Sequence, residues 1–431
     1  MTNLEEEPKR RLRIAWIGTP TPGGGVGGFC RQLIEGLATT EHQVVVFAQG
    51  NEEVEKQLGW EPGKVEFVYA PIDWDWGRWY SRSDLAVFIS SFWARIRSYK
   101  RLIFLLERRH AEKSFDVVIQ FSQTELFSAK RRLKFLPRFI LFPCVHAAGE
   151  LRFHNREREL SRRCESRLKY WLVNLNLRYR SYLQKRAYSS VYGVIGMSRR
   201  FNQWVRLDYG IAKECQAVVY QSKPDASICF DEFTGVDASP GDNKKVRLLF
   251  VGRISVRKGI ETLVDLSHRI DDLRDQVDLI ILGAQSSWSN YVKLLDDLNP
   301  NVAKFIGHFP HRETLDEMRK ADFLLIPSHY EPGGIVVAEA MALGCGIIAS
   351  DEVGSAENLP DSACHRFPAG DMDRFEQVVR EAIGAILNKS GRLNRTDLST
   401  LAAEFFSPKA TTADLLRVCV RAANRQPIGE I

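Results

Sequence analysis

This chain of 431 residues contains no paired-cysteine motif and no long apolar run. Its eight cysteines stand singly, without the spacing of a disulfide framework or a zinc site, so we expect reduced thiols. No apolar segment approaches the length that a membrane-spanning helix needs. Residues 1–11 are polar, begin with an acidic run and lack an apolar signal core. They predict a disordered leader and a cytoplasmic protein.

Two nucleotide-binding motifs are present only in part. The run Gly23–Gly28 contains Gly-x-Gly-x-x-Gly, the dinucleotide fingerprint, so an NAD-dependent oxidoreductase is one alternative. However, the run lies beyond the first predicted strand, 13–17, and the second strand, 44–48, is not followed by the acidic residue that binds the ribose. A P-loop is excluded because no Gly-Lys-Ser/Thr follows. We interpret the run as a flexible loop that lines a cleft. The candidate site residues of this loop are Gly24, Gly25, Gly27 and Gly28.

Positive charge is concentrated in one segment. Apolar residues make up 44% of the chain and charged residues 26%, as in ordinary globular proteins. The net charge is +6, yet residues 151–187 alone carry eleven Lys or Arg against three Glu, a surplus of +8. The basic segment 151–189 also contains six aromatic residues: Phe153, Tyr170, Trp171, Tyr179, Tyr182 and Tyr188.

Basic and aromatic residues together are typical of surfaces that bind nucleic acid, an anionic membrane or an acidic acceptor. A solvated helix face is the plain alternative. We favour a membrane or a lipid-linked acceptor over nucleic acid, because the tryptophans of the loop 71–80 supply a second contact surface in the same half of the chain. A non-catalytic basic module that binds membrane or nucleic acid is the second alternative function.

Apolar strand patterns alternate with helical patterns along most of the chain. This alternation predicts an α/β fold with parallel sheets that helices cover on both faces. A polar, turn-rich linker, 225–245, divides the pattern. It separates an N-terminal domain, 12–224, in which 151–189 is a helical insertion, from a C-terminal domain, 246–405. The remaining residues, 406–431, contain a final helix.

Two such Rossmann-like domains facing each other leave a cleft at the strand ends, where open α/β sheets bind ligands. The strands predicted in the first domain are 13–17, 44–48, 65–69, 116–121, 139–145, 191–197 and 218–220. Those predicted in the second domain are 246–251, 278–282, 302–306, 323–326 and 346–349. The longer predicted helices are 85–113, 260–270, 287–297, 311–320, 335–343 and 408–423.

The strand at 323–326 leads into a stretch that predicts an anion-binding site. Glu331-Pro332-Gly333-Gly334 is a tight turn, and a helical pattern begins at Ile335. The first amides of a helix lack internal partners, and the helix dipole favours negative charge there. Bare backbone at the two glycines lets a phosphate approach closely. Glu339, about 8 Å further along the helix axis, would meet the sugar hydroxyls of a nucleotide.

Glu331 and Glu339, with seven residues between them and Ala-Met-Ala-x-Gly following, resemble a family signature. The family is that of the retaining nucleotide-sugar glycosyltransferases with two Rossmann-like domains, glycosyltransferase family 4 with the GT-B fold. The resemblance includes Phe250-Val251-Gly252-Arg253 with Lys258-Gly259, and Gly354-Ser355-Ala356-Glu357. It covers the C-terminal half well and the N-terminal half thinly. Two positions depart from the pattern: Pro332-Gly333 replaces x-Phe, and Tyr220-Gln221-Ser222 lacks the usual Asn.

The resemblance implies that a nucleotide-diphosphate sugar binds to the second domain. The implied donor-binding residues are Gly252, Arg253, Lys258, Gly333, Gly334, Ile335 and Glu339. Arg253 and Lys258 would neutralise the diphosphate, both in the bound donor and in the leaving group. Arg257 lies between them and is not separable from them by sequence. The glycine loop 23–28 would meet the acceptor or the donor phosphate.

The residues that the resemblance assigns to catalysis are His146, Arg253, Lys258 and Glu331. His146 follows the strand 139–145, where the family places a histidine near the transferred sugar, so it would orient the sugar and the acceptor. The family's reaction is described as a front-face displacement in which the leaving phosphate takes the acceptor proton. Glu331 would contact sugar hydroxyls and is not assigned as a nucleophile.

We expect no cofactor and no obligatory metal. Asp73-x-Asp75 has the spacing of a metal-binding pair, but it lies in the aromatic loop of the first half, away from the diphosphate residues. Cationic side chains and helix amides can carry the charge instead. The expected activity is transfer of a hexose to a glycan, lipid-linked or small-molecule acceptor, as in polysaccharide biosynthesis. The expected location is the cytoplasm, with a peripheral position on the inner face of the membrane left open.

Overall fold

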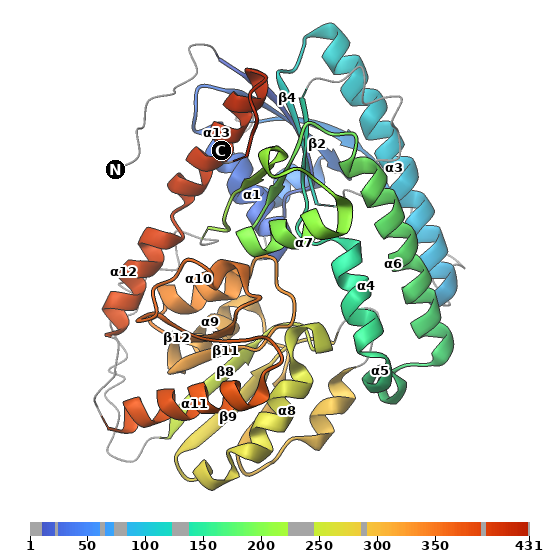
Figure 1. The fold of residues 1–431 in the computed structure, drawn as a ribbon. Coiled ribbons are helices and arrows are strands. Elements are labelled where there is room, and N and C mark those ends of the chain that lie inside the picture. The colour runs from blue at the N-terminus through green and yellow to red at the C-terminus, as the bar shows by residue number, and fades with distance from the viewer. Residues whose placement is uncertain are drawn as a thin grey trace.

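The computed structural model describes residues 11–21, 25–60, 65–72, 84–122, 138–222, 245–285, 291–388 and 394–429. These residues form two α/β domains, which lie one above the other in Figure 1, each around a parallel sheet. The predicted fold class, two Rossmann-like domains, is confirmed. The predicted leader and linker fall almost wholly outside the described residues.

The first sheet has the strand order β3-β2-β1-β4-β5-β6-β7, and its paired strands are parallel. Its strands are β1 (Arg13–Ile17), β2 (Gln43–Gln49), β3 (Glu66–Ala70), β4 (Val117–Phe121), β5 (Arg138–Phe142), β6 (Gly193–Gly196) and β7 (Gln216–Val218). Its helices are α1 (Gly25–Ala38), α2 (Glu53–Leu58), α3 (Asp84–Glu112), α4 (Ala147–Arg156), α5 (Arg158–Cys164), α6 (Arg167–Tyr188), α7 (Arg199–Tyr209) and the short η4 (Lys213–Cys215).

The second sheet has the order β10-β9-β8-β11-β12-β13 and is also parallel. Its strands are β8 (Val246–Val251), β9 (Val277–Leu282), β10 (Ala303–Gly307), β11 (Phe323–Ile326), β12 (Gly346–Ser350) and β13 (Cys364–Phe367). The helices that follow β8 are α8 (Ile260–Arg269), α9 (His311–Lys320), α10 (Ile335–Ala342), α11 (Met372–Leu387), α12 (Arg395–Phe405) and α13 (Pro408–Ala423). The 3-10 helices are η6 (Val256–Lys258), η7 (Asp271–Leu273), η8 (Tyr291–Asp297) and η9 (Gly354–Ala356).

The apolar composition of the central strands explains how each sheet is buried on both faces. Every residue of β1 and β4 is buried. Successive side chains of a strand point to opposite faces. Ile14 and Trp16 therefore pack with α1, whereas Ala15 and Ile17 pack on the other face with α3. Burying both faces leaves the strand ends as the places where polar groups gather.

The C-terminal helix α13 packs on the first domain (Figure 1). Leu415 and Cys419 belong to the same buried cluster as Leu33 of α1. A Cβ at Gly36 of α1 would lie 2.0 Å from the hydroxyl oxygen of Thr412, so this glycine lets the two helices approach closely. The last part of the chain thus ties the two domains together.

The predicted strands each overlap an observed strand, but two local predictions were wrong. Gly25–Gly28 is the first turn of α1 and not a loop. A Cβ at Gly27 would lie 2.1 Å from Thr21 Oγ1, so the glycines let the preceding chain pack on the helix. Residues 291–297 form the 3-10 helix η8 and not an α-helix. Its buried side chains at i and i+3 suit both helix types.

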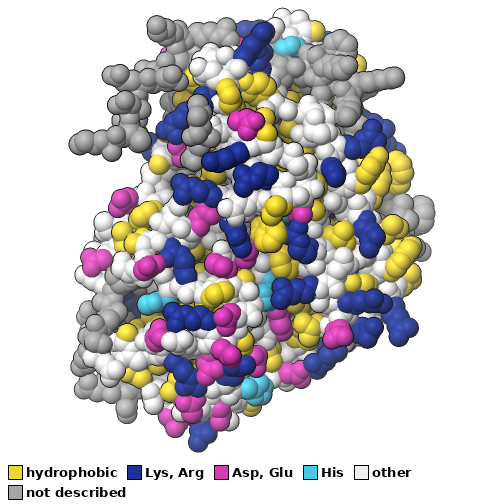
Figure 2. Space-filling model, viewed as in Figure 1, with side chains coloured by type: hydrophobic (Ala, Val, Ile, Leu, Met, Phe, Trp, Pro, Cys, Tyr) yellow, Lys and Arg dark blue, Asp and Glu magenta, His cyan; other side chains and the backbone are white. Residues whose placement is uncertain are grey.

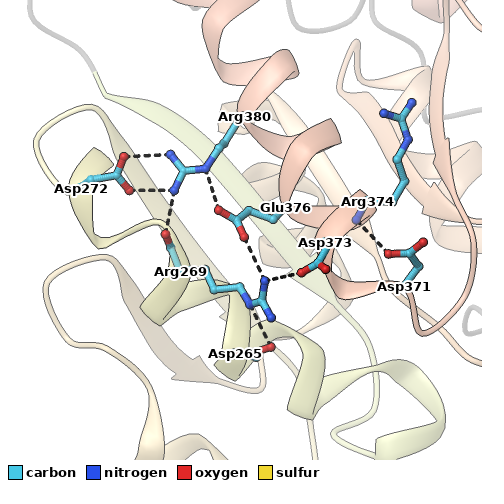
Figure 3. A network of polar contacts seen from close by, with 8 residues as sticks. All are labelled: Asp265, Arg269, Asp272, Asp371, Asp373, Arg374, Glu376 and Arg380. Atoms are coloured by element: carbon cyan, nitrogen blue, oxygen red, sulfur yellow. Dashed lines mark hydrogen bonds and ion pairs between the residues drawn. The ribbon is translucent and has the colours of Figure 1, made fainter.

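A network of ion pairs joins α8 to α11 on the surface of the second domain (Figure 3). Arg380 binds both carboxylate oxygens of Asp272 at 2.8 Å and Glu376 at 2.8 Å. Arg269 binds Asp373 at 2.7 Å and Glu376 at 3.1 Å. Because exposed pairs contribute little singly, we assign this network the role of fixing two helices against each other.

Candidate functional site

The turn between β11 and α10 is held in an unusual backbone conformation. Gly334 has φ of 119°, which side chains rarely tolerate. The hydroxyl of Ser355 donates to the carbonyls of Gly333 and Gly334 at 3.0 and 2.8 Å. A Cβ at Gly259 would lie 2.1 Å from the carbonyl oxygen of Pro327, so η6 packs directly on this turn. The turn and η6 therefore form one rigid unit at the strand ends.

Lys258 and Glu331 form an ion pair inside this unit. Arg257 lies 3.9 Å from the same carboxylate and donates to the carbonyl of Tyr330 at 2.7 Å. Burial lowers the pKa of Lys258 well below its ordinary value, and the neighbouring Arg257 and Arg253 lower it further. Three basic side chains thus gather near one carboxylate. The excess positive charge favours an anionic ligand at this place.

Arg253 follows the end of β8 and is exposed. It has no ion-pair partner in the part of the chain that the structure describes. A Cβ at Gly283 would lie 1.9 Å from the carbonyl oxygen of Gly252, so the backbones at the ends of β8 and β9 lie in contact. Because Arg253 has no ion-pair partner among the described residues, its guanidinium is available to a ligand beside the ion pair of Lys258 and Glu331.

Glu339 lies on α10 and is only 3% exposed, so it is not a solvated surface residue. Its carboxylate is 2.9 Å from Nε2 of His311, at the start of α9. Sequence reasoning did not identify His311, because it is distant in the chain and stands in no recognisable motif. A half-exposed histidine beside a buried carboxylate offers hydrogen-bonding groups at the surface above α10.

The amides at the start of α10 are not all available, which corrects the prediction for the glycine turn. The Gly334 amide donates to Oε1 of Gln221 at 2.9 Å. A Cβ at Gly333 would lie 2.2 Å from that same oxygen, so glycine is needed for the first domain to reach the turn. The amides of Ile335 and Val336 have no hydrogen-bond partner among the described residues. They are the donors that remain for an anion.

His146 was predicted to stand at a strand end beside the cleft, but its side chain is not exposed. It is fully buried at the start of α4, with Nε2 2.7 Å from Asp208 and Nδ1 2.5 Å from the hydroxyl of Tyr330. Since the carboxylate of Asp208 accepts, Nε2 carries the proton and Nδ1 accepts from Tyr330. Burial lowers the pKa of His146, although Asp208 opposes this effect. In this arrangement His146 contacts the residue before Glu331 and no open cleft.

Tyr330 comes from the second domain but is buried among residues of the first. It belongs to the buried cluster around Phe153 and Phe201, and its ring lies 5.5 Å from that of Phe153. Its side chain thus holds the neighbouring Glu331 at the boundary between the domains. Tyr330, Asp208 and Gln221 were all missed from the sequence, because their roles depend on contacts between domains.

Two further acidic residues of the second domain bind α7 of the first. The carboxylate of Glu357 accepts from the amides of Arg199 and Arg200 at 2.7 and 3.1 Å. Glu352 accepts from the side chains of Arg200 and Trp204 at 2.8 and 2.7 Å. A carboxylate at a helix N-terminus is favoured by the helix dipole. These contacts fix the two domains in one relative position.

Glu157, between α4 and α5, makes a third contact between domains and supports a pH prediction. Its carboxylate lies 3.3 Å from the hydroxyl of Tyr291. Burial first, and Glu261 second, raise its pKa from 4.5 to about 8. The folded state therefore keeps a proton that the unfolded state has lost, and its stability falls as the pH rises from about 4.5 to about 8.

Glu157→Gln should remove this loss, because glutamine stays neutral and still accepts from Tyr291. Urea unfolding at about pH 6 and about pH 9 should show the variant losing less stability between the two than the wild type. Glu159→Gln, an exposed neighbour, is the control. Equal pH slopes in wild type and Glu157→Gln would contradict the assignment.

Two protein-family models match the two halves of this chain. Residues 24–220 match the family model of the glycosyl transferase 4-like domain, and residues 236–382 match that of the glycosyl transferases group 1. The two matches cover most of both domains. The chain belongs to this glycosyltransferase family.

The similarity of this glycosyltransferase to known proteins covers different shares of its chain. Glycogen synthase from Mycobacterium tuberculosis is 33% identical over 116 residues, which span 26% of this chain and only 27% of the relative. Sucrose-phosphate synthase from Thermosynechococcus elongatus shares the fold with a TM-score of 0.65 and 16% identity, covering 95% of this chain and 98% of that one. Anabaena HepE, solved in complex with UDP, has a TM-score of 0.59 and 15% identity over 94% of this chain and 98% of its own.

Most of the predicted site residues of the glycosyltransferase lie together at the ends of β8 and β11. These are Gly252, Arg253, Lys258, Glu331, Gly333, Gly334 and Ile335, with Glu339 one turn further along α10. Gly25, Gly27 and Gly28 belong to α1, and Gly24 lies outside the described residues. No group of three or more potential metal ligands occurs among the described residues, which do not include Asp73 and Asp75.

Proposed function

We propose that this glycosyltransferase moves a hexose from a nucleotide-diphosphate sugar to an acceptor hydroxyl with retention of configuration. The observation that carries the proposal is the cluster of Arg253, Arg257 and Lys258 at the strand ends, beside the unpaired amides of α10. A diphosphate bound there meets positive charge from the basic side chains and from the amides at the start of the helix. In this proposal Glu339 binds the ribose hydroxyls and Glu331 binds the sugar.

The basic cluster also explains how the leaving group is stabilised. As the bond between the sugar and the diphosphate breaks, the bonding electron pair and its negative charge pass to the phosphate oxygen. Arg253 and Lys258 bind that oxygen more strongly as its charge grows, which lowers the barrier. The acceptor oxygen attacks from the same face, and its proton passes to the leaving phosphate. No protein nucleophile takes part in this scheme, so Glu331 remains a ligand of the sugar.

His146 acts indirectly in this proposal. Its ring is buried behind Tyr330, so it orients the sugar by holding Tyr330 and, through it, Glu331. The glycine-rich start of α1, Gly25–Gly28, is proposed to face the acceptor from the first domain, together with Gly24, which precedes it in the chain. The acceptor itself is proposed to be a glycan or a lipid-linked molecule, and the place of reaction the cytoplasmic side of a membrane.

The proposal predicts that the activity needs no divalent metal. Arg253, Lys258 and the free amides of α10 supply the positive charge that a metal ion would otherwise give to the diphosphate. We expect nucleoside diphosphate release from UDP-, GDP- or ADP-sugars to continue in EDTA, with water as the acceptor where no other is added. The measurement is the amount of released diphosphate, separated from the nucleotide sugar by anion-exchange chromatography. Complete loss in EDTA, restored by Mg²⁺ or Mn²⁺, would contradict this prediction and direct attention to Asp73 and Asp75.

The NAD-dependent alternative finds less support in the fold. The Gly23–Gly28 fingerprint should form a loop between a strand and a helix, with its last glycine packing the helix on the strand. Instead, α1 begins at Gly25, and Gly27 accommodates Thr21. The absence of any NADH binding by fluorescence titration is the expected result.

A further inference from the structure

A basic groove lies between α5 and α6, apart from the basic cluster of the proposed donor site. It encloses a volume of about 1140 Å³. Arg158 and Arg162 line it from α5, and Arg167 and Arg178 line it from α6. The one carboxylate among the lining residues is Glu165. Positive charge therefore exceeds negative charge in this groove.

The arginines of the groove are poorly neutralised by the protein. Arg158, Arg162 and Arg167 have no ion-pair partner in the described part of the chain, and Arg178 donates to the neutral side chain of Asn174 at 2.8 Å. Guanidinium groups in this state bind phosphate well, because their planar forks donate two hydrogen bonds to it. The groove is thus suited to phosphate groups.

A row of exposed apolar side chains runs along α6 beside the groove. Its members succeed one another at three- and four-residue spacing, so they share one side of the helix. They are 49–66% exposed: Leu168, Trp171, Leu175, Tyr179 and Tyr182. The opposite side of α6 packs on the first domain through Leu177, Ala187 and Tyr188. Apolar groups concentrated in this way on one surface indicate a contact with another body.

We propose that the α5–α6 groove and the exposed row of α6 dock this protein on an anionic phospholipid bilayer. Trp171 and the tyrosines suit the boundary between head groups and acyl chains, and the arginines of the groove bind the lipid phosphates. Figure 2 shows Lys and Arg side chains alternating with hydrophobic ones along the right-hand edge, on the side where Figure 1 draws α6. Within the described ranges, none of the helices has the length and apolar character of a membrane span.

The docked surface is connected rigidly to the rest of the molecule. Cys164 of α5 belongs to the buried core of the second domain, and Arg163 pairs with Asp297 of that domain at 2.7 Å. His146 immediately precedes α4, the helix before α5. Docking α6 therefore holds the domain boundary near the bilayer surface. The acceptor is then a lipid or lipid-linked molecule in that bilayer, a step that rests on the proposed function.

The test is co-sedimentation of the full chain with vesicles of phosphatidylcholine alone or mixed with phosphatidylglycerol. The protein should sediment only with the anionic vesicles, and less at high salt, because salt screens the charges. Reversing Arg158, Arg162, Arg167 and Arg178 to Glu should lower vesicle affinity by roughly a thousandfold or more, since each lost basic residue accounts for roughly a fivefold factor and the added carboxylates repel the anionic lipids.

A second variant tests the apolar row without changing the groove arginines. Trp171→Ser with Leu175→Ser should lower the affinity at low and high salt alike, and both residues are exposed enough to leave the fold intact. The matched controls are Leu207→Ser on α7, a 74% exposed leucine, and Arg312→Glu on α9. Both controls should bind vesicles as the wild type does.

Three outcomes overturn the docking proposal. One is a wild type that ignores anionic vesicles at low salt. Another is a change in Trp171 fluorescence on adding inorganic phosphate, with no vesicle binding, which identifies a site for small anions. The third is binding of single-stranded RNA in place of vesicles. If nucleoside diphosphate still binds, any of these three outcomes overturns the docking proposal and leaves the proposed transfer reaction standing. If vesicles bind and nucleoside diphosphate does not, the proposed function is overturned and the docking proposal stands.

Discussion

Replacing Lys258 with alanine is expected to weaken nucleoside diphosphate binding about tenfold or more. The ammonium group is withdrawn from water beside Glu331, with Arg257 close by. A hydrogen bond from a charged group in such a place contributes ~1.5–3 kcal/mol, which corresponds to a factor of roughly ten to a hundred. The measurement is the dissociation constant by isothermal titration. Arg257 remains near Glu331 in the variant, so the fold should survive.

Glu339→Ala should weaken binding to a similar degree, because its buried carboxylate is assigned to the ribose hydroxyls. The control for both variants is Lys304→Ala, which changes an exposed lysine of the same domain. His311→Ala separates the contact of Glu339 with His311 from its assigned contact with the ribose. Affinity should fall less than in Glu339→Ala, because the carboxylate itself remains. Unchanged affinity in both Lys258→Ala and Glu339→Ala, with the fold intact by circular dichroism, would remove the proposed donor site.

Replacing Tyr330 with alanine is expected to destabilise the protein by about 3–5 kcal/mol, the usual range for removing a buried aromatic side chain. Its ring fills space among residues of the first domain, and its hydroxyl binds His146. The milder Tyr330→Phe removes only the hydroxyl, which binds Nδ1 of His146 and also accepts from the His146 amide at 3.5 Å. Leaving Nδ1 unpaired costs about 1–3 kcal/mol. Urea unfolding measures both effects.

Kinetics separate a positioning role of Tyr330 from a purely structural one. Tyr330→Phe should lower kcat, because Glu331 is held less firmly, while the affinity for nucleoside diphosphate stays near the wild-type value. Tyr192→Phe, which removes the donor of a hydrogen bond to the carbonyl of Gln426, is the control and should change neither quantity. A variant Tyr330→Phe with wild-type kcat would show that the contact with His146 serves stability alone.

The sequence predicted the second domain well because its signals are local. The strand, glycine turn and helix around Glu331 follow from apolar runs and turn residues within a short stretch. The helices 311–320 and 408–423 were predicted at their observed bounds. Helix α7 was not predicted, although Phe201, Val205 and Tyr209 have helical spacing, because the many polar residues of this segment make that spacing hard to recognise.

The parts of the site that the sequence could not predict depend on contacts between the domains. His146 was predicted to face a cleft, but Tyr330 covers it, and the two residues are 184 positions apart. Gln221 accepts a hydrogen bond from the Gly334 amide although the two residues are 113 positions apart. The periodicity of apolar residues does not indicate such a contact between domains, because each partner suits its own local environment equally well without the other. The same reason explains why Glu357 was recognised as part of a motif but not as the carboxylate that binds α7.

The central claim is that the ends of β8 and β11 bind a nucleoside diphosphate. Isothermal titration of the wild-type protein with UDP, GDP and ADP tests it most directly. We predict saturable binding of at least one of the three in the presence of EDTA, about tenfold or more weaker in Lys258→Ala and unchanged in Lys304→Ala. Absence of binding by all three, in protein that is folded by circular dichroism and with Mg²⁺ supplied or withheld, would contradict the account.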